Sequence, residues 1–232
     1  MTRFSFSSRR RYFWSVRWLA SGAFALTLLA TAPLQAGSIG DNAAVSFTGV
    51  TANLNNGYSW SLGWQFTTNV PIAVDALGYY NASLTGGDTS FQDGTCNCGE
   101  VGIYDTSGDL LASATVTSAD PVNGFFNWAA IPVLDLPAGQ TYYVVAETGP
   151  SDYTFYTTGF SVSPDITFDQ DAYVQSSTLA FPTASGGITA SDGGAYFGAN
   201  FDETSVPEPA SLPLCGAAII GLLGVAKRKL TA

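Results

Sequence analysis

The chain has 232 residues, of which 46% are hydrophobic and 11% charged, and its formal net charge is −10. This composition is sufficient for one domain with a packed core and is not typical of a disordered chain. All eight basic residues lie before residue 18 or after residue 226, whereas the eighteen acidic residues lie between Asp41 and Glu208. The central region has no cations to neutralise phosphates, which excludes nucleic acid as a partner.

Residues 1–36 have the pattern of a secretory signal peptide, with a basic n-region, an apolar stretch at 19–30 and small residues leading to Ala36. We expect cleavage after Ala36. The pair Arg10-Arg11 is similar to a twin-arginine export signal, but the residue before it is not the usual serine or threonine, so general secretory export is favoured. An uncleaved membrane anchor is the alternative, although the apolar stretch is short for a membrane span.

Residues 37–205 predict short β-strands separated by turns. In residues 60–67, tryptophan, leucine and phenylalanine alternate with serine, glycine, glutamine and threonine, which indicates a strand with one buried face. Further strands are expected at 72–80, 100–105, 110–117, 125–133, 141–147, 153–158, 166–168, 172–174 and 195–201. The spacing predicts an all-β domain, an antiparallel β-sandwich of the jelly-roll type.

Two segments of this domain, 100–114 and 136–145, resemble β-sandwich domains of bacterial surface proteins. The second reads Leu-Pro-Ala-Gly-Gln-Thr-Tyr-Tyr-Val-Val, a phrase that opens a strand after a turn. The likeness concerns the fold and implies no function.

The C-terminal tail, residues 206–232, has three parts. They are Val206, Pro207, Glu208 and Pro209, then an apolar stretch at 212–226, then Lys227, Arg228 and Lys229. From Pro209 to Lys229 the tail approaches the roughly 20 residues of a transmembrane helix, and the basic end is expected to stay in the cytoplasm. The sequence thus predicts a protein that is exported at one end and stopped in the membrane at the other.

In this order and at this end, the three parts resemble the PEP-CTERM sorting signal. The resemblance implies a Gram-negative host that makes exopolysaccharide, and an exosortase-type membrane protease as a partner. It also implies an intermediate anchored in the inner membrane through the C-terminal helix, followed by delivery to the cell surface or extracellular matrix. An ordinary C-terminal anchor with a proline-rich hinge is the alternative.

The composition removes most kinds of catalysis. The chain has no histidine, so it lacks the nucleophile–histidine pairs of hydrolases and the usual histidine zinc site. The central domain has no lysine or arginine for Schiff-base or phosphate chemistry. A carboxylate pair of the glycosidase type remains, but nothing singles out a pair among Glu100, Glu147 and Glu203. We therefore expect no catalytic residues, with a glycosidase as the weaker alternative.

Aromatic residues of the domain raise the possibility of carbohydrate binding, because sugar rings stack on exposed aromatic faces. The alternation at 60–67 assigns Trp60 and Trp64 to the core, which is the commoner place for aromatic side chains in sandwiches. Tyr143 and Tyr156 remain as candidates for stacking on a polysaccharide.

The polar loop at 86–99 carries Cys96 and Cys98, which after export can form a disulfide that staples the loop. The same loop carries Asp88 and Asp93, hard oxygen ligands that suit a structural calcium, although no complete calcium-loop motif is present. Loop solvation is the alternative for these aspartates and for a second group, Asp165, Asp169 and Asp171. No cofactor other than this calcium is expected.

The sequence as a whole predicts a non-catalytic cell-surface or matrix protein, sorted by exosortase-type processing and associated with exopolysaccharide or biofilm. A carbohydrate-binding module that recognises the matrix polysaccharide is the alternative.

Overall fold

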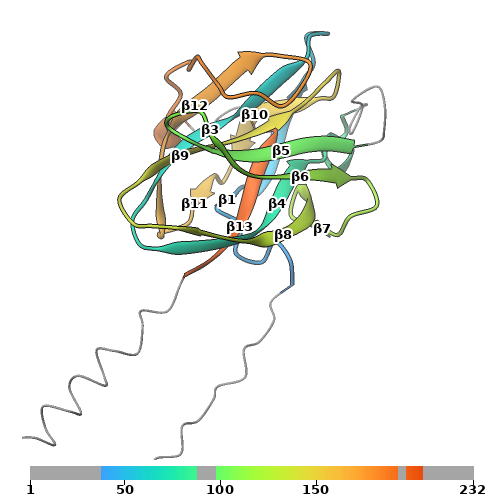
Figure 1. Ribbon diagram of the computed structural model, residues 1–232. Coiled ribbons are helices and arrows are strands. Elements are labelled where there is room, and N and C mark those ends of the chain that lie inside the picture. The colour runs from blue at the N-terminus through green and yellow to red at the C-terminus, as the bar shows by residue number, and fades with distance from the viewer. Residues whose placement is uncertain (1–37, 88–97, 193–196, 206–232) are drawn as a thin grey trace, which may run out of the picture. The chain divides into compact units, whose positions relative to one another are not determined.

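The computed structural model describes residues 38–87, 98–192 and 197–205 (Figure 1). The expected signal peptide, the sorting tail and the loop residues Asp88, Asp93 and Cys96 lie outside the described residues. Within the described part of the chain, no helix is long and apolar enough to cross a membrane.

The described elements are strands and two short 3-10 helices, so the prediction of an all-β domain is confirmed. The first strands are β1 (Val45–Ser46), β2 (Gly49–Leu54), β3 (Trp60–Thr68), β4 (Ile72–Tyr80), β5 (Cys98–Asp105) and β6 (Leu110–Thr117). They are followed by β7 (Val122–Asn123), β8 (Phe126–Leu136), β9 (Thr141–Glu147), β10 (Tyr153–Thr158), β11 (Ser161–Val162), β12 (Ile166–Gln175) and β13 (Ala199–Ser205). The 3-10 helices are η1 (Ala82–Thr85) and η2 (Ala190–Asp192).

The strands form two main antiparallel sheets. One has five strands in the order β12-β3-β9-β5-β6, and the other has four in the order β13-β4-β8-β7. Two smaller pairs, β1-β11 and β10-β2, complete the domain. Successive strands β3 and β4 belong to different sheets, as do β8 and β9, so the chain winds back and forth between two layers. The architecture is β-sandwich-like, as the sequence predicts.

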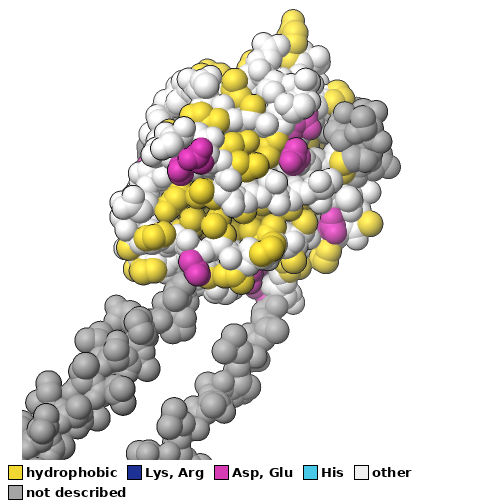
Figure 2. Space-filling view, viewed as in Figure 1, with side chains coloured by type: hydrophobic (Ala, Val, Ile, Leu, Met, Phe, Trp, Pro, Cys, Tyr) yellow, Lys and Arg dark blue, Asp and Glu magenta, His cyan; other side chains and the backbone are white. Residues whose placement is uncertain are grey.

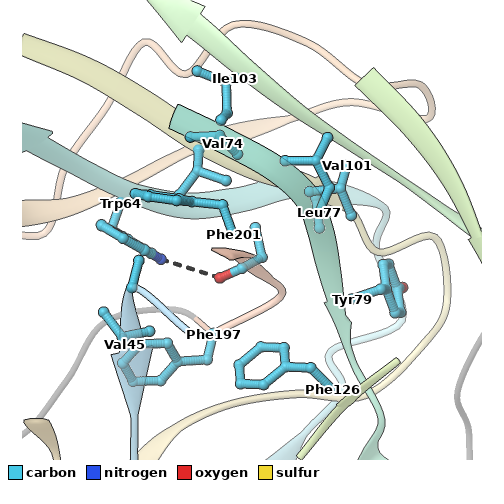
Figure 3. Packing of buried hydrophobic residues seen from close by; sticks show 14 of the residues in the cluster. Val45, Trp64, Val74, Leu77, Tyr79, Val101, Ile103, Phe126, Phe197 and Phe201 are labelled. Carbon is cyan, nitrogen blue, oxygen red and sulfur yellow. Dashed lines mark hydrogen bonds between the residues drawn. The ribbon is translucent and has the colours of Figure 1, made fainter. Parts of the chain in front are cut away.

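The two sheets pack face to face through a core of aromatic side chains. Trp64 of β3 packs against Phe201 of β13 with ring centroids 5.5 Å apart (Figure 3). The ring centroid of Phe66, also on β3, lies 4.7 Å from that of Phe201. The indole Nε1–H of Trp64 donates a 3.1 Å hydrogen bond to the carbonyl of Ala199, so the buried polar group has its partner.

The alternation that predicts β3 is confirmed over 64–68, whereas Ser61 and Gly63, which it assigns to the solvent face, are buried. Leu62, Trp64 and Phe66 are buried, while Gln65 between them is half-buried on the outer face. Trp60 is the exception to the expected core, because it lies at the first position of the strand and is only half-buried. Its indole donates to the side chain of Asn56 at 3.0 Å, outside the core cluster.

The first described residues lie along the last strand. The Ala44 N–H donates to the Phe201 carbonyl at 2.8 Å, and the Glu203 N–H donates to the Asn42 carbonyl at 3.1 Å. The Asp202 carboxylate accepts further bonds from the backbone N–H groups at 40 and 42. We call residues 38–44 the N-terminal strap, and it places both ends of the domain side by side (Figure 1).

Candidate functional sites

The strand register builds a row of polar and aromatic side chains on the outer face of the five-stranded sheet. Gln170 of β12 pairs with Gln65 of β3, Gln65 pairs with Tyr143 of β9, and Tyr143 pairs with Tyr104 of β5. Since alternate residues of each strand face the core, these four share the opposite face. The row brings together residues from four strands that are far apart in the sequence.

Hydrogen bonds fix the polar part of this row. Gln65 Nε2 donates to the Tyr143 hydroxyl at 2.7 Å, and Gln170 Nε2 donates to Gln65 Oε1 at 3.0 Å. The Ser185 hydroxyl then donates to Gln170 Oε1 at 3.1 Å. Each amide is therefore oriented before any ligand arrives, which lowers the entropic cost of binding.

The segment between β12 and η2, residues 176–189, crosses this face and covers part of the row. We call it the covering segment. Phe181 packs edge-on against Tyr143 and Tyr104, with ring centroids 5.1 and 5.8 Å apart. Asp171 anchors the segment, because its fully buried carboxylate accepts from the N–H groups of Gly186 at 2.7 Å and Ile188 at 2.9 Å. Charge-assisted bonds of this kind are stronger than neutral ones and hold the covering segment in place.

A groove remains where the covering segment leaves the sheet. It has a volume of about 360 Å³, and its lining includes Thr106, Tyr143, Gln170, Phe181 and Ser185. We call it the Tyr143 groove. A cavity of this size with aromatic rings and oriented amide and hydroxyl groups can receive a small polar ring such as a sugar.

The structure separates the two tyrosines that the sequence singles out. Tyr143 lies in the groove, half-buried. Tyr156 lies on β10, where its backbone pairs with Ala52 of β2 outside the five-stranded sheet. The sequence missed Gln65, Gln170 and Phe181, since only the strand register and the covering segment bring them to Tyr143.

The three glutamates of the domain lie on three strands. Glu100 of β5 is exposed and Glu147 of β9 is buried, and they flank the paired residues Val101 and Ala146. Glu203 lies on β13 in the other sheet, so the glutamates do not form one site.

Glu203 is the most unusual of them. It follows Phe201 by two positions on β13 and pairs with the buried Val74, so it faces the interior at one end of the sandwich. Only 3% of its surface is exposed, and neither carboxylate oxygen has a hydrogen-bond partner of good geometry. The pKa of Glu203 is raised to about 7, mainly by burial; the nearby Ser163 hydroxyl opposes the rise, and the charges of Asp165 and Asp202 contribute to it.

A cavity of about 450 Å³ adjoins this glutamate. Besides Glu203, its lining includes Asn42 of the N-terminal strap, Ser163 and Asp165 from the turn before β12, and Thr204. We call it the Glu203 cavity. Three segments that are distant in the sequence meet there.

Asp202, the neighbour of Glu203, is also buried, but its carboxylate is satisfied. It accepts from the backbone N–H groups of Gly40 at 2.7 Å and Asn42 at 2.8 Å. Burial raises the pKa of Asp202, these two bonds lower it, and the charges of Asp75 and Asp41 raise it.

Cys98 is disulfide-bonded and buried, and its partner lies outside the described residues. The pairing with Cys96 therefore stays a prediction, as does calcium binding by Asp88 and Asp93.

The second aspartate group does not form a site. Asp169 accepts from the Thr67 hydroxyl at 2.8 Å, Asp171 anchors the covering segment, and Asp165 lies at the Glu203 cavity. The described residues contain no group of three or more Cys, Asp or Glu side chains arranged to hold a metal ion.

The fold and its grooves define a β-sandwich-like domain with an acidic surface. The face in Figure 2 carries separate acidic side chains among apolar and neutral ones, and no basic side chain. Residues 47–197 match the model of a family described as a domain of unknown function, DUF4082, and the chain belongs to this family. No curated protein and no solved structure matches the chain.

Proposed function

We propose that this protein is an exported, non-catalytic component of the cell surface or extracellular matrix. Its DUF4082 domain is carried between a signal peptide at 1–36 and a PEP-CTERM-type sorting tail at 206–232. The tail carries the proposal, because its motif, apolar stretch and basic end occur in the order of that signal. The charge layout supports it, since every cation belongs to one of the two targeting segments and none to the domain.

The geometry of the domain suits this role. The N-terminal strap runs beside β13, so the polypeptide enters and leaves the domain at the same end. A domain tethered there presents the rest of its surface away from the tether, whichever end is processed. The pairs β3–β9, β4–β8 and β5–β6 are nested within one another. Nesting of this kind supports assignment to the jelly-roll type of sandwich.

Cell fractionation tests the sorting proposal. The full chain is followed in a Gram-negative host with an exosortase, beside a variant in which Pro207, Glu208 and Pro209 are replaced by alanine. We expect the native chain to reach the surface or medium in shortened form, while the variant stays in the inner membrane. The exposed substitution Asp135→Asn is the matched control and should be sorted normally. Equal distribution of native chain and tail variant, in hosts with and without the exosortase, contradicts the proposal.

A second candidate function is recognition of the matrix polysaccharide, and the Tyr143 groove favours it. The groove combines aromatic rings with amides already held by hydrogen bonds, which are the groups that stack on and bind sugar hydroxyls. A purely structural protein has no need of such a groove.

Co-sedimentation with purified exopolysaccharide separates the two functions. We expect Tyr143→Ala and Gln170→Ala to weaken binding severalfold. Tyr58→Ala is the matched control, because Tyr58 is 60% exposed and lies outside the groove. Thermal unfolding of each variant identifies any loss of binding caused by loss of the fold. Absence of binding in the native chain contradicts polysaccharide recognition, and equal binding in all variants contradicts a role for the Tyr143 groove.

A further inference from the structure

Glu203 presents an unbalanced charge inside the domain. Its two oxygens are shielded from water and accept no hydrogen bond of good geometry in the structure. A carboxylate in this state is strongly disfavoured, because it has lost its hydration and gained nothing in return. In native proteins the charge of a buried carboxylate is usually balanced by a basic side chain or a bound metal ion.

The part of the chain that the structure describes supplies no basic side chain. Residues 38–205 contain no lysine, arginine or histidine. The charged neighbours of Glu203 are acidic: Asp165 from the turn before β12, and Asp202 beside it on β13. Asp202 in turn faces Asp41 of the N-terminal strap and Asp75 of β4. Among the described residues, therefore, no side chain can neutralise Glu203, which leaves a proton or a cation from solution.

We propose that the Glu203 cavity is a binding site for a divalent hard cation, with calcium the best fit. Glu203 and Asp165 supply two carboxylates, and Ser163 and Asn42 supply neutral oxygen atoms on the wall of the same cavity. Carboxylate, hydroxyl and amide oxygens are the ligands of calcium and magnesium. Calcium is favoured because it accepts irregular arrangements with bound water, whereas magnesium demands an octahedron.

The small number of carboxylates sets the expected affinity. Two carboxylates and water suit a dissociation constant of about 10⁻⁴–10⁻³ M, the range of extracellular calcium modules. Such a site fills in an extracellular setting, which agrees with the proposed export but does not depend on it.

The location gives the ion a structural effect. Asn42 belongs to the N-terminal strap, Asp165 precedes β12, and Glu203 lies on β13, so one ion would join three segments. Both ends of the domain would be clamped to the sandwich when calcium is bound. Removal of calcium would loosen the end from which the polypeptide continues toward the sorting tail.

Thermal unfolding of the purified full-length chain at about pH 8 tests the site. After treatment with a chelator, calcium is added over about 0.1–10 mM, a range that spans the expected dissociation constant. Sodium chloride of equal ionic strength controls for screening of the acidic surface. We expect calcium at tenfold excess over its dissociation constant to raise the unfolding midpoint by about 3–5 °C beyond the salt control.

Matched variants locate the effect. Glu203→Gln and Asp165→Asn should each abolish most of the calcium response, and Asp135→Asn, which removes an exposed carboxylate on β8, should retain it. The double variant Asp88→Asn/Asp93→Asn should also retain it, which separates this site from the predicted loop site. If one variant does not fold, the other still tests the site, and equilibrium dialysis of calcium gives the number of ions bound.

Three results overturn the proposal: no calcium response in the native chain beyond salt, an unchanged response in Glu203→Gln or Asp165→Asn, or loss of the response in the loop double variant alone. Each of these results means that calcium does not bind at Glu203.

Discussion

Replacing Glu203 by glutamine should make the domain less sensitive to pH when no divalent cation is present. Glutamine has nearly the same shape as protonated glutamate but cannot ionise. Burial raises the pKa of Glu203 from 4.5 to about 7, so folding favours the protonated form. The charges that face it, from Asp165 and Asp202, act in the same direction.

The sign of the effect follows from proton linkage. Because the pKa of Glu203 is higher in the folded state, its contribution to stability is fully present below about pH 4.5 and is lost as the pH rises through about 7. The rise from 4.5 to about 7, at about 1.4 kcal/mol per pH unit, corresponds to about 3 kcal/mol. Relaxation of the surrounding protein and nearby water lowers the effective interaction, so we expect about 2 kcal/mol.

Urea unfolding followed by tryptophan fluorescence, in chelator at about pH 4.5 and about pH 8, measures this contribution. The free energy of unfolding of the native chain should fall by about 2 kcal/mol more than that of Glu203→Gln between the two pH values. Asp202, whose pKa is also raised by burial, keeps its own pH dependence in both proteins. Asp135→Asn should behave as the native chain. An equal pH dependence in native chain and glutamine variant would refute the reasoning.

Three further substitutions test the packing around the candidate sites. Trp64→Ala should lower the free energy of unfolding by about 3–5 kcal/mol in urea, because it removes a fully buried indole from between the sheets. Gly99→Ala should lower the unfolding midpoint, at a cost of about 1–3 kcal/mol, because a Cβ there would overlap the ring of Tyr79; an unchanged midpoint would mean that the ring moves freely. Asp171→Ala should speed amide hydrogen exchange at Gly186 and Ile188, whose N–H groups lose their buried acceptor, and unchanged exchange there would contradict its anchoring role.

Much of the fold is visible in the sequence because its strands carry the period of two. Residues 60–67 predict β3 from alternation alone, and turn residues separate the other long strands. The pattern failed where polar residues interrupt a strand. β12 is continuous over Ile166–Gln175, whereas the sequence predicts two pieces, because Asp169 and Asp171 in its middle lower the β signal. Their carboxylates are bonded to Thr67 and to the covering segment, respectively.

The sequence does not predict β1, β2, β7 or β11, of which β1, β7 and β11 have two residues each. β1 has two residues and pairs with β11 across more than a hundred positions, and β2 pairs with β10 in the same way. β13 was predicted at 195–201, but it extends over Ala199–Ser205. Its last residues are polar and acidic, so the apolar pattern ends before the strand does.

The candidate sites were only partly visible in the sequence. The sequence singles out Tyr143 as an aromatic residue that is not assigned to the core. Gln65 and Gln170 lie beside it only because of the register of the strands, which the sequence does not show. The sequence does not distinguish Glu203 from the other two glutamates of the domain. Its burial depends on the N-terminal strap, which lies beside the end of β13 and is far away in the sequence. One signal was present: two acidic residues, Asp202 and Glu203, directly follow the apolar end of a predicted strand.

The absence of cations in the domain explains how its carboxylates are used. Residues 38–205 have no basic side chain, so no ion pair with one can form among the described residues. Carboxylates accept from backbone N–H groups instead. The aspartates that do so are Asp41, Asp105, Asp120, Asp171, Asp192 and Asp202. Each of these carboxylates stabilises a turn or links one segment to another by hydrogen bonds. In an acidic domain without basic side chains, such bonds take the place of ion pairs.

Glu203 departs from this rule, since it is buried like Asp171 and Asp202 but receives no backbone N–H. If its only role were to fill space, an apolar residue would do so without the cost of a buried carboxyl group. A buried carboxylate near other carboxylates, in a cavity whose lining also includes hydroxyl and amide groups, is instead what a cation site requires. The distribution of charge in the domain therefore also points to Glu203 as the position for the proposed cation.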